Sequence, residues 1–395
     1  MATLLEKIEN EQRTHARLSD FIKIKHGFAF KGEYFSAKPT KDILVTPGNF
    51  AIGGGFKADK FKYYAGTASE DYILKAGDLV VTMTDLSVDA DTLGYSALIP
   101  NDTNVQFLHN QRVGLVQQIK EGIDLGFLYY LMRTREYQSY VVGGASGSTV
   151  KHTSPDRIAS FEYDFPSLPT QRKIAEILSA YDEKIENNDK IIKNLEATAQ
   201  AIFDEWFVAL HFPGYEKAKI ANGSIGEIPK EWEEKSVLDI IERIGVGKKY
   251  DNKSAIPTGK IQILDQGKSG NIGYHNEEPG VMASIENPVV VFTNHTCYYR
   301  LMTEPFSCIQ NVLPYVGKNG YPTLFVYFLT KDKIKMQEYK GHWPDFEQQG
   351  FVVPSAKLAN DFAERITPFI GEMVACEKEN AFLKESRDRL LKKLI

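Results

Sequence analysis

The sequence predicts an α+β protein in which two α/β domains are separated by two long antiparallel coiled-coil helices, with this arrangement duplicated inside one chain. Three observations predict it: two stretches of unbroken heptad spacing, a constant offset of 188 residues between them, and a strand-rich mixed segment before each stretch. The expected parts are a first domain at 1–169, a central helix at 170–212, a second domain at 213–354 and a distal helix at 355–395.

The first heptad stretch contains no Gly or Pro, and its apolar positions alternate at spacings of four and three. This spacing gives one narrow seam, and at 1.5 Å per residue the helix would be about 50 Å long. A single stretch of this kind is also compatible with an ordinary amphipathic core helix. A seam of this length nevertheless favours a partner helix, and its positions are Ile174, Leu178, Tyr181, Ile185, Asn188, Ile192, Leu195, Ala199, Ile202 and Trp206.

The matching stretch lies 188 residues downstream, from Phe362 to Leu394, and repeats the same spacing. Pro368 is expected to interrupt the start of this helix. If the helices pair antiparallel with their ends flush, Asn188 falls opposite Asn380. We expect this amide pair to fix the register of the coiled coil, because an unmatched buried Asn would face an apolar side chain. The alternative is that one or both lie exposed on a shallow seam.

Composition narrows the class of protein. The chain of 395 residues is 43% hydrophobic and 25% charged, which is typical of a globular protein. The three cysteines form no Cys-x-x-Cys pair, so neither a zinc site nor a disulfide scaffold is predicted, and no metal or cofactor is expected. Residues 1–17 are charged and are expected to form a short amphipathic helix. No apolar run is long enough to span a membrane, so a cytoplasmic protein without membrane contact is predicted.

The net charge of −5 conceals a segregated distribution. Residues 23–62 contain eight lysines against three acids, and residues 243–268 contain six basic residues against two acids. The first long helix is acidic over 171–206, with five basic residues against eight acids. Local basic surfaces attract phosphates even when the total charge is negative. Ordinary solvated lysines are the alternative for each patch.

Three stretches carry a resemblance to a known family: FPSLPTQRKIAEILSAYDEKIENNDKIIKNLEATAQAIFDEWF (Phe165–Phe207), GEIPKEW (Gly226–Trp232) and ESRDRLLKKLI (Glu385–Ile395). With them, nearly the whole chain resembles the specificity subunit of type I restriction–modification enzymes. The resemblance implies two target recognition domains, each reading one half of a bipartite double-stranded DNA site. It also implies two methyltransferase subunits docked around the helices, and ATP-dependent restriction subunits in the full complex. The helix pair would act as a ruler, because half-sites one helical turn apart are about 34 Å apart.

The candidate DNA contacts are basic, amide and aromatic side chains on Gly-rich loops, because such groups bind phosphates and base edges. In the first domain they are Lys31, Lys57, Lys60, Lys62, Tyr63, Arg112, Ser148, Thr149, Lys151 and His152. In the second domain they are Lys248, Lys249, Lys253, Gln266, Lys268, His275, His342 and Trp343. Less secure candidates interrupt strands and could instead satisfy backbone groups; these are Arg112 itself, Asn110, Gln111, Gln310 and Asn311.

No catalytic residue is predicted in this chain. A methyltransferase cofactor loop and a phosphate-binding loop are both missing from the sequence. Pro155-Asp156 with Asp182-Glu183-Lys184 superficially fits a nuclease pattern, but the last three lie in the coiled-coil helix, where solvated charge is expected. The rival hypothesis is a structural scaffold that joins two protein partners without reading DNA. That hypothesis explains the acidic helix but not two basic loop regions at matching places in a duplicated frame.

Overall fold

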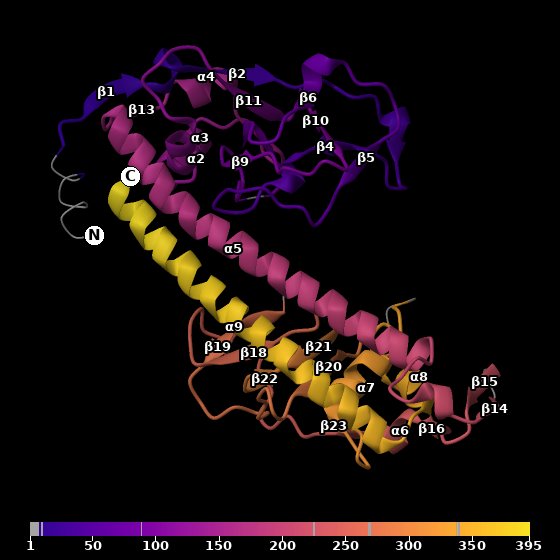
Figure 1. The fold of residues 1–395 in the computed structure, drawn as a ribbon. Helices are drawn as coiled ribbons and strands as arrows, with labels where there is room; N and C mark the ends of the chain where they lie inside the picture. Colours follow the sequence, from indigo (N-terminus) through magenta and orange to yellow (C-terminus); the bar gives the residue numbers. More distant parts are fainter. Residues whose placement is uncertain are drawn as a thin grey trace. The chain divides into compact units, whose positions relative to one another are not determined.

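The computed structural model describes residues 8, 11–87, 89–223, 226–267, 270–336, 338 and 340–395. The chain forms two compact units (Figure 1). The first comprises Met1–Ile185 together with Ala381–Ile395, and the second comprises Glu186–Asn380. Each unit therefore holds one mixed domain and a part of both long helices. Among the described residues, no helix is long and apolar enough to cross a membrane.

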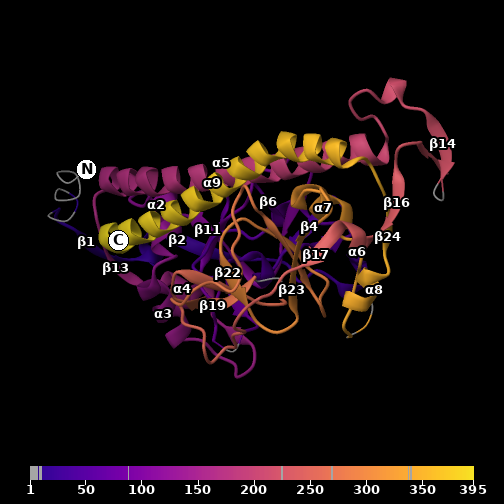
Figure 2. The ribbon, with the colours of Figure 1, turned by 90° about the horizontal axis from the view of Figure 1, so that it is seen from below.

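The two long helices are α5 (Leu168–Phe203), which continues into a π-turn at Asp204–Val208, and α9 (Ala356–Leu394). Within each unit the helices lie side by side (Figures 1 and 2). They run antiparallel, because Trp206 contacts Phe362 with ring centroids 6.1 Å apart in the second unit, while Ile174 and Leu394 share one buried cluster in the first. The predicted helix pair is confirmed.

Two local expectations were wrong. Pro368 does not interrupt α9, which is continuous across it. The proline removes one backbone hydrogen bond, to the carbonyl of Glu364, and both residues are exposed, so water can satisfy that carbonyl. The expected helix at 1–17 is not formed at its end, because Thr14–Arg17 is strand β1. Tertiary pairing with β13 (Glu162–Phe165) overrides the local pattern there; residues 1–7 and 9–10 lie outside the described part.

The first domain is built on two sheets. One has the antiparallel order β2 (Ile22–His26), β11 (Val113–Gln118), β7 (Leu79–Thr82), β9 (Ser96–Leu98). The other has the order β3 (Phe35–Ser36), β5 (Lys62–Tyr64), β4 (Asp42–Val45), β10 (Gln106–His109), β6 (Ile73–Leu74), with β10 parallel to β4. A short pair joins β12 (Lys151–His152) to β8 (Thr84–Asp85). The helices are α2 (Leu125–Leu131), α3 (Arg135–Gly143) and α4 (Pro155–Ala159).

The second domain repeats this plan. Its antiparallel sheet has the order β17 (Ile241–Arg243), β23 (Val312–Gly317), β20 (Val289–Thr293), β21 (Tyr299–Met302). Its second sheet has the order β19 (Asn271–His275), β18 (Ile261–Leu264), β22 (Phe306–Cys308), with β22 parallel to β18. Strand β16 (Glu233–Ser236) pairs with β24 (Gly350–Val353), as β1 pairs with β13, and a hairpin joins β14 (Ile220–Gly223) to β15 (Gly226–Pro229). The helices are α6 (Val237–Ile240), α7 (Thr323–Thr330) and α8 (Trp343–Glu347). The predicted α+β fold with internal duplication is confirmed.

The two domains share their strands but differ in their loops. Strands β2 and β17 begin 219 residues apart, β10 and β22 begin 200 apart, and α4 and α8 begin 188 apart. The falling offset means that the first domain has longer connections. Its loop between β4 and β5 spans 46–61, whereas the corresponding loop between β18 and β19 spans only 265–270. The strands thus form a common frame on which the connections diverge.

Each domain packs its core against the long helices through one helix. In the first unit, α2 contributes Phe127 and Leu128 to a buried cluster with Leu178 of α5. In the second unit, α7 contributes Phe325, whose ring contacts Phe203 of α5 at 6.1 Å between centroids. The loops that carry the candidate contacts are therefore attached to rigid strands and a rigid helix pair.

Candidate nucleic-acid interface

The clearest site in the first domain is the turn between β10 and β11, formed by residues 110–112. Strand β2 is followed by Gly27, which passes so close that a Cβ there would lie 2.2 Å from the carbonyl oxygen of Asn110. The next residue, Phe28, binds the backbone of the turn, because the Gln111 backbone N–H donates to the Phe28 carbonyl oxygen at 3.0 Å. The turn is thus held rigidly while Gln111 and Arg112 remain exposed.

This turn lines a cleft of about 260 Å³ with residues from two other loops. We call it the Lys62 cleft, and its lining is Phe30, Gly32, Phe35, Thr46, Lys62, Asn110, Gln111 and Arg112. The ammonium of Lys62 lies over the Phe35 ring, 3.8 Å from its centroid. The cleft therefore combines two exposed cations with the exposed amide of Gln111 and an aromatic face, a set able to bind phosphate and base edges, while the Asn110 amide is buried. Lys62 and Arg112, predicted separately, are brought together here.

A buried histidine lies beneath the same turn. His109 ends β10 and lies 2.8 Å through Nε2 from the carbonyl oxygen of Val113. Burial lowers the pKa of His109 to about 4, so the ring is neutral near pH 7. Because the neutral ring donates through Nε2, the turn is fixed from below without adding charge to the cleft.

The remaining basic candidates of the first domain are exposed on neighbouring loops. Lys31 lies 3.8 Å from Glu33, and Lys57 lies 3.6 Å from Asp59. Both ion pairs are exposed, so salt weakens them. Lys60 is exposed, and its carbonyl accepts from buried Asn49 at 3.0 Å. Tyr63 is half-buried in β5.

The Gly/Ser-rich loop at 143–152 is a separate surface. Ser148 and Thr149 are exposed, and Lys151 and His152 form β12 against β8. The Nδ1 atom of His152 lies 3.1 Å from Oγ1 of Thr84, and the histidine itself is exposed. These four residues remain accessible candidates on an ordered loop.

In the second domain the corresponding turn, between β22 and β23, is formed by residues 309–311. Gln310 is exposed, and Asn311 adopts a left-handed conformation with φ of 65°. Lys249 forms a bridge with Cys308 beside this turn, as Phe28 does with Asn110 in the first domain. Lys248 and Lys249 are exposed, so this domain also places cations and an amide at its turn; Lys253 is exposed nearby, and its backbone N–H donates to Asp251.

His275 was wrongly predicted as a DNA contact, because it is buried at the end of β19. Its Nδ1 accepts the backbone N–H of Glu277 at 3.1 Å, so Nε2 carries the proton and donates to Ser307 Oγ at 2.9 Å. Burial lowers the pKa of His275. A histidine that already donates to the serine cannot take its proton, so this Ser-His-Glu grouping is structural. Glu277 also accepts Lys248 at 2.7 Å, an ion pair that DNA phosphate would have to displace.

His342 and Trp343 were also wrongly placed at the surface. His342 is buried and lies 3.0 Å through Nδ1 from the Asp345 carboxylate. Trp343 begins α8 and is 6% exposed, packing on Phe292 and Phe346 while its indole N–H donates to Glu347 at 2.6 Å. Both belong to the core because α8 packs against the antiparallel sheet.

Gln266 lies in the loop between β18 and β19 and is half-buried. Its side-chain oxygen accepts the backbone N–H of His295 at 3.2 Å. The predicted contact Lys268 lies outside the described residues. In the described part of the chain, no group of three or more His, Cys, Asp or Glu side chains is placed to hold a metal ion.

The helix pair carries two polar contacts within its seam. Asn188 donates to the side-chain oxygen of Asn380 at 3.0 Å and to Glu379 at 2.7 Å, and Asn380 donates to Asp189 at 2.8 Å. Both asparagines are buried. The two side chains therefore lie in one layer, where flush antiparallel pairing places them.

The second polar contact corrects the expectation of solvated charge at Asp182. This carboxylate accepts Tyr130 at 2.7 Å, Arg133 at 3.2 Å and Arg387 of α9 at 2.5 Å. The Tyr130 pKa is raised, first by burial and then by the Asp182 charge. Sequence reasoning missed this cluster, because a single acid in a helix gives no signal of its partners.

Known proteins resemble this chain in both sequence and structure. Residues 10–197 match the family described as type I restriction modification DNA specificity domain. The type I restriction enzyme MjaIX specificity subunit of Methanocaldococcus jannaschii is 25% identical over 305 residues, covering 70% of this chain and 69% of that protein. The HindI specificity subunit of Haemophilus influenzae is 38% identical over 85 residues, covering 21% and 18%.

A solved structure shows the same fold. The S subunit of a type I restriction–modification system from M. genitalium superposes with a TM-score of 0.59 at 16% identity, covering 98% of this chain and 96% of that one. Residues 10–197 thus carry the type I restriction modification DNA specificity domain, and the chain over most of its length is similar to type I restriction enzyme specificity subunits.

Proposed function

We propose that this chain reads a bipartite double-stranded DNA target, one half with each domain, and that it does so without catalysing a reaction. The observation that carries the proposal is that both domains place an exposed amide at one topological position, with exposed cations at or beside it. That position is the turn after β10 in the first domain and after β22 in the second. A duplicated frame with two similar polar turns suits a molecule that makes two separate groove contacts.

The two half-sites should differ in sequence. The first turn contains Asn110, Gln111 and Arg112, of which the last two are exposed, whereas the second contains Ile309, Gln310 and Asn311. Arginine favours paired contacts to guanine and glutamine or asparagine favours adenine, so different side chains at one place favour different bases. The longer connections of the first domain add to this difference.

The helices would set the unspecified spacer between the half-sites and dock two methyltransferase subunits, with restriction subunits completing the assembly. Methylation and ATP-dependent cleavage would then belong to those partners, and this chain would need no cofactor. DNA inside the cell is the target, so the proposed location is the cytoplasm. Support for these points comes from the family and from the acidic surface of α5.

The proposal is tested by selection of binding sites from a random duplex library, using the full chain with its methyltransferase subunits. A reader of DNA should enrich one gapped motif and keep its selectivity as salt lowers bulk affinity. A scaffold that only joins proteins would enrich no motif at any salt concentration. Adding one heptad to both helices should lengthen the gap in the motif and leave the specified bases unchanged.

Charge removal at the Lys62 cleft should change the salt dependence of binding. We expect Lys62→Ala and Arg112→Ala each to lower the slope of log K against log salt by about one, because each removes one phosphate contact. Fluorescence anisotropy with the selected duplex measures the slope. The control is Lys193→Ala, which removes an exposed lysine of acidic helix α5. Equal slopes for all three variants would rule the cleft out as a phosphate site.

The asparagine layer should couple the two helices. Asn380→Leu should destabilise the second unit by about 0.5–1.5 kcal/mol, because it removes the buried hydrogen bond that Asn188 donates to Asn380. The double variant Asn188→Leu/Asn380→Leu should recover much of that loss while removing the polar group that specifies register. A double-mutant cycle measured by chemical unfolding gives the coupling energy. Strict additivity of the two single changes would show that the layer does not set the register.

A further inference from the structure

We propose that two largely buried arginines, Arg133 and Arg300, are positioning residues that hold the recognition loops of the two domains in the shape that reads DNA. Arg133 would hold the loop between β4 and β5, and Arg300 the loop between β18 and β19. The inference rests on the proposed function and deepens it. It concerns the loops that carry the candidates Lys57 and Lys60 in the first domain and Gln266 in the second.

Arg300 donates hydrogen bonds to backbone carbonyls of the short loop between β18 and β19. It lies on β21, and its side chain is 17% exposed. Its Nη1 donates to the carbonyl oxygens of Asp265 at 3.2 Å and Gly270 at 2.7 Å, and its Nη2 donates to the carbonyl oxygen of Gly267. One planar guanidinium therefore ties both ends of the loop together, and the single ammonium of a lysine cannot reproduce that fork.

The same loop is tied again beside Gln266. The hydroxyl of Thr296 donates to the carbonyl oxygen of Gln266, and the backbone N–H of His295 donates to its side-chain oxygen at 3.2 Å. With its oxygen engaged, the side chain of Gln266 keeps its amino group as the donor for a DNA acceptor. The loop thus presents a glutamine of fixed orientation.

Arg133 contacts the long loop between β4 and β5 at Gly53 and Gly54. It follows α2, its side chain is 7% exposed, and its Nε donates to the carbonyl oxygen of Gly53 at 3.0 Å. Nη1 donates to the hydroxyl of Tyr129 at 2.8 Å and to Asp182 at 3.2 Å, which fixes the arginine itself. The loop lies directly on it, because a Cβ at Gly54 would stand 2.4 Å from Arg133 Cγ, and Gly54 has φ of +85°.

The two arginines come from different places in the frame, one after a helix and one from a strand. Each loop therefore has its own support. Arg133 and Arg300 direct their donors to groups of the protein, among them loop carbonyls, so their loss should disturb the shape of a loop rather than remove a phosphate contact. Base discrimination depends on that shape, whereas non-specific binding depends on charge.

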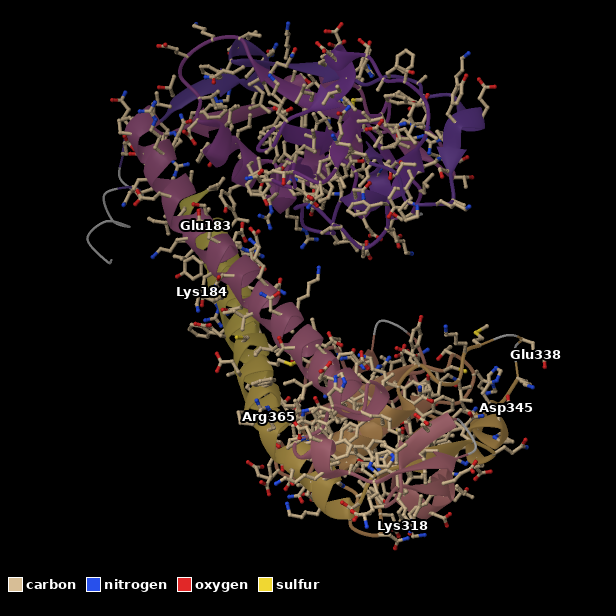
Figure 3. All side chains as sticks on the ribbon, turned by 45° about the vertical axis from the view of Figure 1, so that its right-hand side comes forward. Glu183, Lys184, Lys318, Glu338, Asp345 and Arg365 are labelled. Atoms are coloured by element: carbon tan, nitrogen blue, oxygen red, sulfur yellow. The ribbon has the colours of Figure 1, made fainter. Side chains whose placement is uncertain are left out.

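The test is site selection and competition binding with the full chain, its methyltransferase subunits and a random duplex library. Arg300→Lys should lower discrimination at one half of the gapped motif by about tenfold or more and leave the other half intact. Arg133→Lys should give the mirror-image result. Arg365→Lys, a change at an exposed position of α9, is the matched control and should alter neither half (Figure 3).

The outcomes separate the inference from the function on which it rests. If the unaltered chain selects no motif, the proposed function and this inference both fail. If the motif is selected and the arginine variants leave it unchanged, or weaken both halves equally, the function stands and the inference is overturned.

Two further variants keep the inference falsifiable if an arginine variant does not fold. Gly54→Ala pushes the first loop off Arg133, and Thr296→Val removes one tie of the second loop, while both leave the arginines in place. Each should reduce discrimination at a single half-site, and thermal unfolding followed by circular dichroism confirms that each is folded. Full discrimination in both folded variants would overturn the proposal.

Discussion

Replacing Asp182 by alanine should lower the unfolding free energy of the first unit by about 1–3 kcal/mol, because the largely buried Arg133 and Arg387 lose their shared acceptor. The Asp182 side chain is 27% exposed and is the shared acceptor for Arg133 and Arg387. Tyr130 loses its acceptor as well. Native-state hydrogen exchange measured by mass spectrometry reports the loss in the peptides of α2.

The neighbouring residue provides the control. Glu183 is exposed on α5, one position further along the same helix (Figure 3), and Glu183→Ala should change stability by less than about 0.5 kcal/mol. A similar loss of protection in both variants would mean that helix propensity or net charge dominates. In that case the Asp182 carboxylate would not be the central partner of the two arginines.

Trp343→Ala should lower the unfolding free energy of the second unit by about 3–5 kcal/mol, because it removes a large buried side chain and leaves a cavity. The indole contacts Phe292, Tyr315 and Phe346, all of which are buried. Chemical unfolding followed by tyrosine fluorescence measures the effect. The salt slope of DNA binding should stay unchanged, since Trp343 is a core residue.

An exposed aromatic residue tests whether loss of any large ring has this effect. Phe382 of α9 is 68% exposed, and Phe382→Ala should leave stability within about 0.5 kcal/mol of the original chain. A reduced salt slope in Trp343→Ala at temperatures where the protein is folded would contradict the assignment of Trp343 to the core.

The helix pair was the most predictable part of the molecule, since a heptad pattern depends only on local geometry. Counting layers from Ile174 and Leu394 placed Asn188 opposite Asn380, where the structure has them. The expected interruption at Pro368 failed for a local reason. One missing backbone bond at an exposed position costs too little to end a helix held by its seam.

The candidate site was less predictable because its members are distant in sequence. Lys62 and Arg112 were each found by charge, but only the sheet order shows that they share a cleft. His275 and His342 looked like loop histidines because burial is decided by tertiary packing. Arg133 and Arg300 gave no signal, since a lone arginine after a helix or in a strand resembles any solvated charge.

The first unit is built from two separate segments of the chain, and this has a consequence for biosynthesis. Its core includes Leu394, and Arg387 pairs with Asp182, yet residues 186–380 of the other unit come between. A ribosome adding about 5–20 residues per second needs roughly 10–40 s to pass that stretch. During this interval the emerged first domain lacks part of its own hydrophobic lining. The nascent chain therefore completes its earliest domain last, when synthesis reaches residues 381–395.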